Sequence, residues 1–320
     1  MILTLTPNPA LDVTYELDDI SLHAENRVRR VRTAPGGKGV NVARVLAQLG
    51  VESVCAGPLG GGPGERLRTL LDQENAADGR ARIHQAWTEI AAPTRSTLAV
   101  VDPEGATGLY EPGPPLTAEE VTALAGDLQT LLEGDPRPEA VTISGSLPGG
   151  VTADDLAELI GRCHRADRPV LVDTSGPAML AAARAGADVL KPNADEALAA
   201  TGRATPLEAA RSLTELGARI VICSLGADGM IGVQSTDRGV RAWHAALPTP
   251  LSGNATGAGD AVVAALATTV LPGATDLPTA LRRAVAVGAS AVVRPIAGQI
   301  DPACLAEVEP TVVIEEIPCP

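Results

Sequence analysis

From residue 117 onward, the hydrophobic positions of the chain alternate between two regular patterns. Stretches with apolar residues at helical spacing are followed by short, continuous apolar runs that are typical of buried strands. The expected helices cover residues 117–132, 152–166, 177–185, 194–201 and 205–216, and the expected strands are Ala140–Ser144, Val170–Asp173, Asp188–Leu190 and Arg219–Ser224. This order predicts an α/β fold with a mostly parallel sheet that helices cover on both faces.

The same two patterns extend to both ends of the chain. Further strands are expected at Met230–Gln234 and Val240–His244, and further helices at 257–270 and 276–294. At the N-terminus we expect a strand at Met1–Leu5, a helix ending near Gly50, a strand at Val51–Ala56, a loop at Gly57–Gly64 and a helix at Glu65–Asn75. No repeat or linker divides the sequence, so residues 1–320 are expected to form a single domain.

Four early strands do not fit this alternation. They are expected at 13–17, 27–33, 95–101 and 107–110. A second, smaller sheet accounts for them better than a place in the parallel sheet. We expect them to form a β lid, from about 12–34 and 94–112, that is attached to the main body and covers its cleft.

One lid segment, residues 27–32, holds four arginines in six positions. Arg27 and Arg29 either belong to a solvated strand face or face an anionic ligand, and the sequence leaves both interpretations open.

Composition restricts the functions that this chain can have. It has 320 residues, of which 45% are hydrophobic and 20% charged, which is enough to bury a core. Aromatic residues make up 1% and the formal net charge is −14. Few aromatics argue against base stacking on single strands, and the negative charge argues against duplex DNA and anionic membranes as partners.

Cysteine usage and apolar run lengths indicate the compartment. The five cysteines are scattered and form no C-x-x-C pair, which favours a reduced cytoplasm and no zinc site. The longest apolar run, Ala261–Leu271, is far shorter than the ~20 residues of a membrane span. The sequence opens on a strand-like Ile2–Leu5 without the charged start of a signal peptide, so we expect a cytoplasmic protein.

The turn Asn254–Asp260 carries the strongest chemical signal. It leads into an apolar, alanine-rich helix, and its glycines let the backbone approach a ligand closely. Free N–H groups at a helix start can hold phosphate oxygens, and Asp260 could take a proton from an attacking hydroxyl. The structural alternative is that Thr256 caps the helix and Asp260 interacts with the helix dipole.

Other polar residues follow expected strands. Asp12 comes after the first strand, and Ser144 ends another. Lys191 directly follows the strand Asp188–Leu190, and Ser224 ends the strand Arg219–Ser224. Because ligands of open parallel sheets bind beyond the carboxyl ends of the strands, these residues are candidates for one site.

Several common sites are excluded. The sequence contains no G-x-x-x-x-G-K-[ST] loop and no strand followed by G-x-G-x-x-G, so a P-loop or a dinucleotide site is not expected. The four histidines have no G-x-S-x-G partner, and no His/Cys cluster predicts a metal held by the protein alone.

Six segments, in order, carry a resemblance to a known family. They are Thr6–Asp12 (TPNPALD), Pro35–Arg44 (PGGKGVNVAR), Ser144–Pro148 (SGSLP), Lys191–Glu196 (KPNADE), Ser224–Gly226 (SLG) and Gly257–Asp260 (GAGD). Together they resemble the ribokinase-like sugar kinases of the phosphofructokinase-B type, in the branch of 1-phosphofructokinase, tagatose-6-phosphate kinase and the minor 6-phosphofructokinase. The resemblance runs from residue 1 to about 300 and implies a three-layer α/β/α body with a β lid.

The resemblance also implies a role for each matching position. Asp260 matches the general base, and Gly257, Ala258 and Gly259 match the anion hole. Asn193 and Glu196 match the residues that position Mg²⁺ through water. Asp12, Gly37, Lys38, Asn41 and Ser144 match sugar-binding positions. Arg95 matches the arginine that holds the substrate's own phosphate, and Ser224 and Gly226 match the nucleotide side.

The function implied is phosphorylation of a hexose phosphate by ATP with Mg²⁺, first of all fructose 1-phosphate at O6. Lys38 and Arg95 would supply the positive charge that a phosphorylated sugar needs in so acidic a chain. Tagatose 6-phosphate or another sugar, even an unphosphorylated one, is the alternative within this class. A non-catalytic regulator that binds sugar or nucleotide is the alternative outside it, and Asp260, Asn193 and Glu196 argue against it.

Three further expectations concern details. The branch usually has Ser where this chain has Ala261, and often has Glu-x-Asn where this chain has Gly108-Leu109-Tyr110; these departures bear on the choice of sugar. Family analogy allows a monovalent cation beside the anion hole. An exposed lid edge allows a homodimer through the lid.

Overall fold

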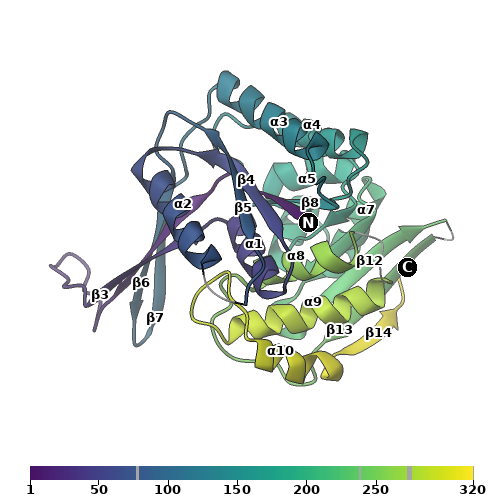
Figure 1. The fold of residues 1–320 in the computed structure, drawn as a ribbon. Coiled ribbons are helices and arrows are strands. Elements are labelled where there is room, and N and C mark those ends of the chain that lie inside the picture. Colours follow the sequence, from purple (N-terminus) through teal and green to yellow (C-terminus); the bar gives the residue numbers. More distant parts are fainter. Residues whose placement is uncertain (77–78, 238, 272–275, 320) are drawn as a thin grey trace.

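The larger sheet forms the centre of the molecule. The computed structural model describes residues 1–76, 79–237, 239–271 and 276–319. In these residues the sheet has ten strands in the order β14-β13-β12-β11-β10-β9-β8-β1-β4-β5 (Figure 1). Their bounds are β1 Ile2–Leu5, β4 Ser53–Leu59, β5 Ile83–Glu89, β8 Ala140–Ser144, β9 Val170–Asp173, β10 Val189–Leu190, β11 Ile220–Ser224, β12 Met230–Thr236, β13 Gly239–Ala246 and β14 Val313–Ile317. Neighbours from β5 to β11 run parallel, and β12, β13 and β14 are antiparallel.

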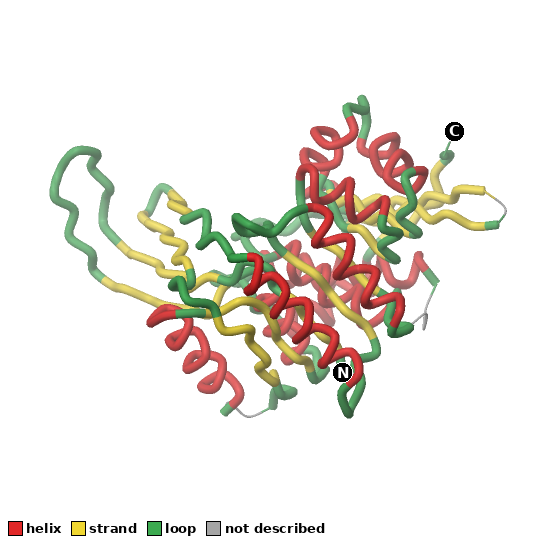
Figure 2. The backbone as a smooth tube through the Cα atoms, turned by 90° about the horizontal axis from the view of Figure 1, so that it is seen from above, coloured by secondary structure: helices red, strands yellow, loops and turns green. Residues whose placement is uncertain are grey.

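Helices cover both faces of this sheet (Figure 2). One core holds side chains of α1 Lys38–Gln48, α8 Ala258–Thr269, α9 Leu277–Val292 and α10 Pro302–Val308. The other holds side chains of α3 Ala118–Glu133, α4 Ala153–Arg165, α5 Gly176–Arg184, α6 Ala194–Thr201 and α7 Pro206–Glu215. Side chains alternate across a strand, so Ile2 faces the first core while Leu3 faces the second. The prediction of a mostly parallel, three-layer α/β/α fold is confirmed.

Sequence signals at the helix starts explain why these helices begin where they do. Thr117, Thr152, Asn193 and Thr205 each cap a helix in a reciprocal capping box with the acidic residue three positions later. Each box satisfies two backbone donors that would otherwise lack partners. The expected helices at 117–132, 152–166, 194–201 and 205–216 are accordingly confirmed to within two residues at each end.

The early strands form a second sheet of four strands in the described residues, in the order β3-β2-β6-β7. Their bounds are β2 Ala10–Glu16, β3 Arg30–Gly36, β6 Arg95–Asp102 and β7 Gly105–Tyr110. We call these four strands the lid. The lid projects from the body beside α2 Gly61–Asn75 (Figure 1). The expected small sheet is thus present, although β3 begins three residues later than expected. Its register with β2 pairs Gly36 with Ala10 and Arg30 with Glu16, so β3 begins opposite the last residue of β2.

Some boundaries were predicted wrongly. The expected loop at Gly57–Gly64 is instead the end of β4 and the first turn of α2. Sequence analysis missed β5, α10 and β14 altogether. Both missed strands lie at sheet edges, and β14 is largely exposed with two consecutive glutamates, so neither shows the continuous apolar run of a central strand.

Helix α8, which follows the turn 254–260, packs closely against its neighbours, and hydrophobic periodicity does not predict such packing. Ala261, Ala264 and Ala265 of α8 are fully buried, and α8 lies against both α1 and α9. At the α8–α9 contact, a methyl group on Gly288 would lie 2.8 Å from Cγ2 of Val262. None of the helices that the structure describes is long and apolar enough to cross a membrane.

We expect Gly288→Ala to lower the free energy of unfolding by about 1–3 kcal/mol, because the buried Val262 cannot give way without repacking. Gly126→Ala is the matched control, since Gly126 lies inside α3 and a methyl group there meets nothing within 4 Å. It should raise stability by about 0.5–1 kcal/mol. Urea unfolding measures both; an equal gain in the two variants would contradict close packing of α8 on α9.

Candidate active site

The carboxyl ends of neighbouring strands bring several predicted residues together. Ser144 ends β8 and Asp173 ends β9, and the two are paired in register. Lys191 follows β10 directly, and its ammonium group lies next to Gly259 at the start of α8. The start of α8 therefore lies over the same edge of the sheet, as expected for a ligand site in an open α/β fold.

Asp260, the expected base, is buried in the first turn of α8. Its carboxylate accepts a hydrogen bond of 2.8 Å from Nδ2 of Asn41, which comes from α1. Burial raises the pKa of Asp260 to about 7, the negative charge of Asp173 adds to this, and Asn41, Lys38 and Lys191 oppose it. The group can therefore exchange a proton near neutral pH, as a general base must.

Asp173 is the centre of a charge cluster that sequence analysis did not identify. Its Oδ1 atom lies 3.2 Å from Nζ of Lys38 and 3.7 Å from Nζ of Lys191. Asp173 and Lys191 are almost fully buried, whereas the Lys38 side chain is 40% exposed. Asp173 Oδ2 is buried without a hydrogen-bond partner. Sequence analysis named Lys191 but missed Asp173; the signal that could have found Asp173 was its place at the end of β9, next to the strand that Lys191 follows.

The ammonium group of Lys38 is held in its charged form. Burial lowers the pKa of Lys38, but the nearby carboxylates of Asp173, Asp260 and Glu196 outweigh this effect, so the pKa is raised. Its charge is thus available to an anion, and its partly exposed side chain can reach into the cleft.

The start of α8 has the geometry of an anion hole. Its N-cap is Gly257, with φ 85°, and no side chain caps the helix. The alternative interpretation of Thr256 as N-cap is therefore wrong; the backbone N–H of Thr256 instead donates to Oδ1 of Asn254. Gly257 is required by space as well, because a methyl group there would lie 2.8 Å from Cα of Ala297. Uncapped N–H groups at a helix start are a ready-made site for phosphate oxygens.

The lid contributes a second group of predicted residues. Asp12 accepts a hydrogen bond of 2.5 Å from Thr97, and burial raises its pKa more than Thr97 and the nearby arginines lower it. Gly36 leaves room for this carboxylate, since a methyl group on Gly36 would collide with it. Tyr110 is paired with Thr97 and therefore lies on the same face of the lid as Asp12.

Arg95 begins β6 and is held by the backbone. Its guanidinium donates to the carbonyl oxygens of Glu111 and Asn8 at 3.0 and 3.2 Å. Burial lowers its pKa, which the charges of Asp12 and Glu111 oppose.

Gly37, the N-cap of α1, has φ 102°, and a methyl group there would lie 2.9 Å from Thr6. Gly37 is thus needed for the turn that presents Lys38.

Asn193 and Glu196 are partly engaged within their own helix. They form the capping box of α6, in which Asn193 Oδ1 accepts from Glu196 N–H and Glu196 Oε2 accepts from Asn193 N–H. Asn193 forms a β-bridge with Ser224 at the end of β11, and Gly226 follows with φ 64°. The capping box uses only Oε2 of Glu196, so its other carboxylate oxygen can bind a cation or a bridging water.

The donor set suits Mg²⁺ held mainly by water and phosphate. Among the residues that the structure describes, no group of three or more His, Cys, Asp or Glu side chains could hold a metal ion. Mg²⁺ commonly uses one or two carboxylates together with waters and substrate phosphates. Glu196 and Asp173 are carboxylates of this kind, and Glu196 is close enough to influence the pKa of Lys38.

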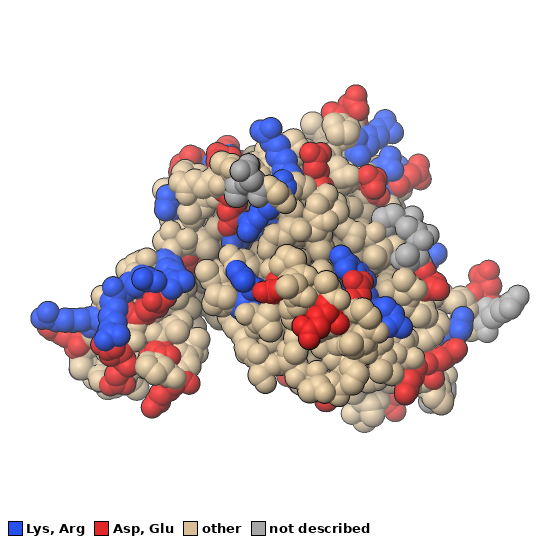
Figure 3. All heavy atoms as spheres, turned by 60° about the horizontal axis from the view of Figure 1, so that its bottom comes forward, with Lys and Arg blue, Asp and Glu red and all other residues tan. Residues whose placement is uncertain are grey.

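The arginine-rich lid segment is paired within the lid. Arg29 forms an ion pair with Asp18, and Arg32 with Glu16. Figure 3 shows basic side chains along the outer end of the lid, which is set off from the body by an indentation. The structure thus accounts for Arg29 by a contact inside the lid and shows no contact of Arg27 or Arg29 with the cluster around Asp260.

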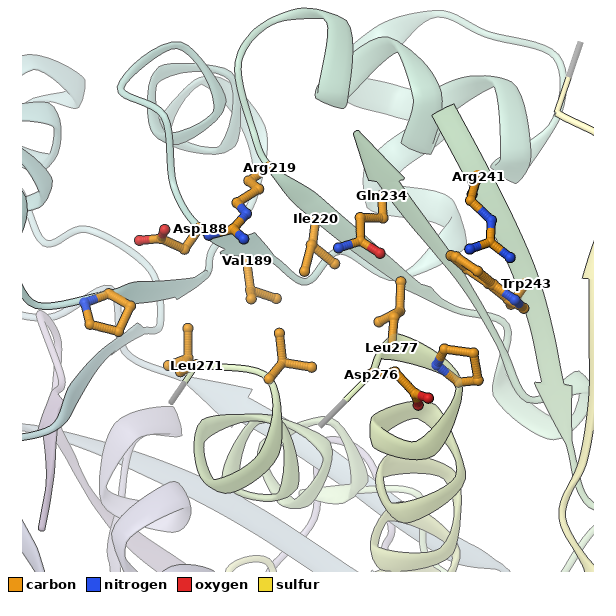
Figure 4. A pocket seen from close by; sticks show the side chains of 13 residues that line it. Asp188, Val189, Arg219, Ile220, Gln234, Arg241, Trp243, Leu271, Asp276 and Leu277 are labelled. Carbon is orange, nitrogen blue, oxygen red and sulfur yellow. The ribbon is translucent and has the colours of Figure 1, made fainter. Parts of the chain in front are cut away.

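A separate cavity lies away from these residues. A cavity of about 430 Å³ is lined by residues that include Asp188, Arg219, Gln234 and Trp243 (Figure 4). Asp188 and Arg219 immediately precede β10 and β11, so this cavity lies at the amino ends of the strands, whereas Asp260 lies beyond their carboxyl ends. It does not include any of the predicted site residues.

Comparison with known proteins decides the family. The pfkB family of carbohydrate kinases matches residues 7–304, a span that includes Asp12, the α1 turn, the Asp173 cluster and the start of α8. The chain belongs to this family. It is therefore a carbohydrate kinase, and the resemblance inferred from the six sequence segments is confirmed.

Solved structures agree with this assignment. Phosphofructokinase-2 from Escherichia coli, in its complex with potassium, is 30% identical, with 97% of this chain and 98% of that chain covered and a TM-score of 0.85. That protein has also been solved with fructose-6-phosphate and in a tetrameric inhibited form. A possible 1-phosphofructokinase from Thermotoga maritima (23% identical, 99% and 100% covered, TM-score 0.82) and ribokinase from Arabidopsis thaliana (18%, 96% and 98%, 0.71) share the fold.

In this kinase, we expect Asp260→Asn to increase stability at pH 8. The pKa of Asp260 is raised from its ordinary value of 3.8 to about 7 in the folded protein. Folding therefore takes up a proton between these pH values, and stability falls as pH rises through them. Removing the buried charge should raise the free energy of unfolding at pH 8 by roughly 2–4 kcal/mol.

The matched control for this prediction is Asp276→Asn, which changes an exposed N-cap of α9 that asparagine caps equally well. Chemical unfolding at pH 4, 6 and 8 should show a shallower pH dependence for Asp260→Asn than for the wild type or this control. A stability loss at pH 8 confined to Asp260→Asn would contradict the raised pKa.

Proposed function

We propose that this kinase transfers the γ-phosphoryl group of ATP to O6 of fructose 1-phosphate, giving fructose 1,6-bisphosphate. The observation that carries this proposal is the buried carboxylate of Asp260 at the start of an uncapped helix, beside two lysines. Phosphoryl transfer needs alignment and charge neutralisation more than covalent chemistry, and this arrangement supplies both.

Each part of the site has a role in the proposal. Asp260 takes the proton of the sugar hydroxyl as it attacks, and the backbone N–H groups of Gly257, Ala258 and Gly259 hold the oxygens of the transferring group. Lys191 and Lys38 neutralise the developing charge from the sheet and α1 sides. Mg²⁺, bound through water to Asn193 and Glu196, would neutralise the nucleotide phosphates, and Ser224 and Gly226 would border the nucleotide.

The sugar phosphate would bind between the lid and α1. Asp12 accepts hydrogen bonds from sugar hydroxyls, and Asn41 donates to them. Gly37 and Ser144 border the ring, and Arg95 and Lys38 face the phosphate. Ser144 supports this placement, because its buried hydroxyl has no hydrogen-bond partner. The bound fructose-6-phosphate in the E. coli relative supports a phosphorylated hexose as the substrate class.

We further propose that residues 1–320 act as one kinase domain whose lid closes over the sugar and excludes water, which limits ATP hydrolysis. The potassium complex of the E. coli relative supports a monovalent cation beside the anion hole of this chain. The tetrameric form of that relative supports self-association as well.

A dimer through the lid would cover an apolar surface. Strand registers place Val31, Tyr15, Leu98 and Leu109 on the lid face opposite to Asp12. Val31 and Leu109 are 57% and 58% exposed. Contiguous exposed apolar groups of this kind mark association surfaces, so we propose that two copies pair through this face.

For the lid dimer, we expect Leu109→Asp to shift the mass in solution from dimer to monomer, because a buried charge without a partner is costly. Val313→Asp, at an exposed position of β14 on the body, should leave the mass unchanged. Multi-angle light scattering measures both. A monomeric wild type, or a Leu109→Asp variant that stays dimeric, refutes this interface.

The substrate proposal is tested by a panel of sugars with ATP and Mg²⁺. We expect kcat/KM to be highest for fructose 1-phosphate, then for tagatose 6-phosphate and fructose 6-phosphate, and far lower for unphosphorylated fructose. Coupled ADP release measures the rate, and NMR of the product identifies the phosphorylated oxygen. Equal turnover of an unphosphorylated sugar would remove the phosphate-binding role of Arg95.

In the same assay, Asp260→Asn should lower kcat by about 10²–10⁴-fold, the usual contribution of a general base. Asp276→Asn serves again as the control and should retain full activity. Sugar and nucleotide binding without any turnover in the wild type would favour the non-catalytic regulator instead.

A further inference from the structure

One buried arginine connects α1, which carries Lys38 and Asn41 of the candidate active site, with three other segments. Arg44, on α1, is 2% exposed. Its Nε and Nη2 atoms form a bidentate ion pair with Glu74 in the last turn of α2, at distances of 2.7 to 3.1 Å. Its Nη1 atom donates to the carbonyl oxygen of Ala297 at 2.8 Å, and to Asn41 Oδ1 and the carbonyl oxygen of Pro35 at 3.4 Å. Glu74 thus neutralises the buried charge and leaves Nη1 directed at the site.

The contact with Asn41 determines which way this amide faces. A guanidinium only donates hydrogen bonds, so the oxygen of Asn41 must face Arg44. The nitrogen then faces Asp260 and donates to its carboxylate. If the amide rotated by half a turn, its oxygen would face a carboxylate oxygen, and the hydrogen bond that stabilises the ionised form of Asp260 would be lost.

The contact with Ala297 supports the other half of the catalytic turn. Gly257 packs so tightly on Ala297 that a methyl group on Gly257 would come within 2.8 Å. The segment around Ala297 is held from α1, because Gln48 Nε2 donates to the carbonyl oxygen of Gly298 and Gln48 Oε1 accepts from Ile300 N–H. A displaced Ala297 would therefore change the backbone position of Gly257 and with it the proposed anion hole.

We propose that Arg44 is a positioning residue for phosphoryl transfer, which fixes the Asn41 amide against Asp260 and Ala297 against Gly257 at the same time. Arg44 makes no direct contact with Asp260, so it acts through these two neighbours. This inference rests on the proposed function, since it assigns the geometry that the base and the anion hole require.

The groups that face Asp260 define what a pH profile would report. They are Asn41 and Lys38 from α1, Asp173 from β9 and Lys191 from the segment after β10. Arg44 is absent from this set. We therefore expect a shift in the titration of Asp260 on changing Arg44 to pass through Asn41 or through the start of α8, whereas a general loss of packing would lower stability without a defined shift.

The test uses two variants of the full-length kinase. Arg44→Lys keeps the charge but cannot reach Glu74, Asn41 and Ala297 together. Gly298→Ala keeps the arginine side chain but adds a methyl group 2.6 Å from the Arg44 Nη1 atom and 3.0 Å from Asn41 Oδ1, so it displaces this contact. Each should lower kcat about 10- to 100-fold and should raise the acid limb of kcat/KM by roughly one pH unit.

Each variant has a matched control. Arg80 also pairs with Glu74, at 3.8 Å, but has no contact with Asn41, so Arg80→Lys should leave kcat and the acid limb unchanged. Gly202 ends α6 with φ 66° in open space, so Gly202→Ala carries the same backbone cost as Gly298→Ala, where φ is 74°, without the contact. Thermal unfolding of all four variants identifies any loss of fold.

The titration of Asp260 is also measured without substrate, by NMR of carboxyl-labelled aspartate in the wild type and in Gly298→Ala. A raised Asp260 pKa in Gly298→Ala and not in Gly202→Ala supports the role of Arg44. Folded variants that keep both the wild-type acid limb and the wild-type Asp260 titration overturn it. A wild type that phosphorylates no sugar refutes the proposed function instead, and the NMR comparison then still decides the positioning of Asp260.

Discussion

The interaction on which the site depends is the neutralisation of two buried carboxylates. Asp260 and Asp173 are both buried, and their like charges raise the pKa of Asp260 together with the loss of water. Lys38, Lys191 and the Asn41 amide oppose this effect. A buried charge without partners would be expelled or protonated, so the positions of these groups are coupled to one another.

The α/β body supplies these partners from segments that are distant in sequence. The carboxyl ends of the parallel strands lie together, which places Asp173 beside Lys191. Helix α1 contributes Lys38 and Asn41. Helix α8 can lie close to α1 because its buried residues include four alanines beside larger apolar side chains. Small residues in α8 thus allow the hydrogen bond between Asn41 and Asp260 to be short.

The solved structures that resemble this chain share its fold at identities from 18% to 30%. A fold retained at such identities determines where ligands bind and leaves open which sugar is chosen. In the function proposed above, the choice falls to side chains of the lid, among them Asp12, Arg95 and Tyr110. Lys38 and Arg95 would attract the anionic substrate despite the net charge of −14.

The sequence by itself determined the alternating helices and buried strands, the small lid sheet, the family and the glycine turn before Asp260. These signals are local, because caps, periodicity and motif spacing lie within a few residues of one another. The polar edge strands β5 and β14, the cluster of Asp173 with Lys191 and the contacts of Arg44 were decided only by tertiary structure. Each depends on residues far apart in the chain, as between Asn41 and Asp260 or Arg44 and Ala297, and no local pattern records which side chains then meet.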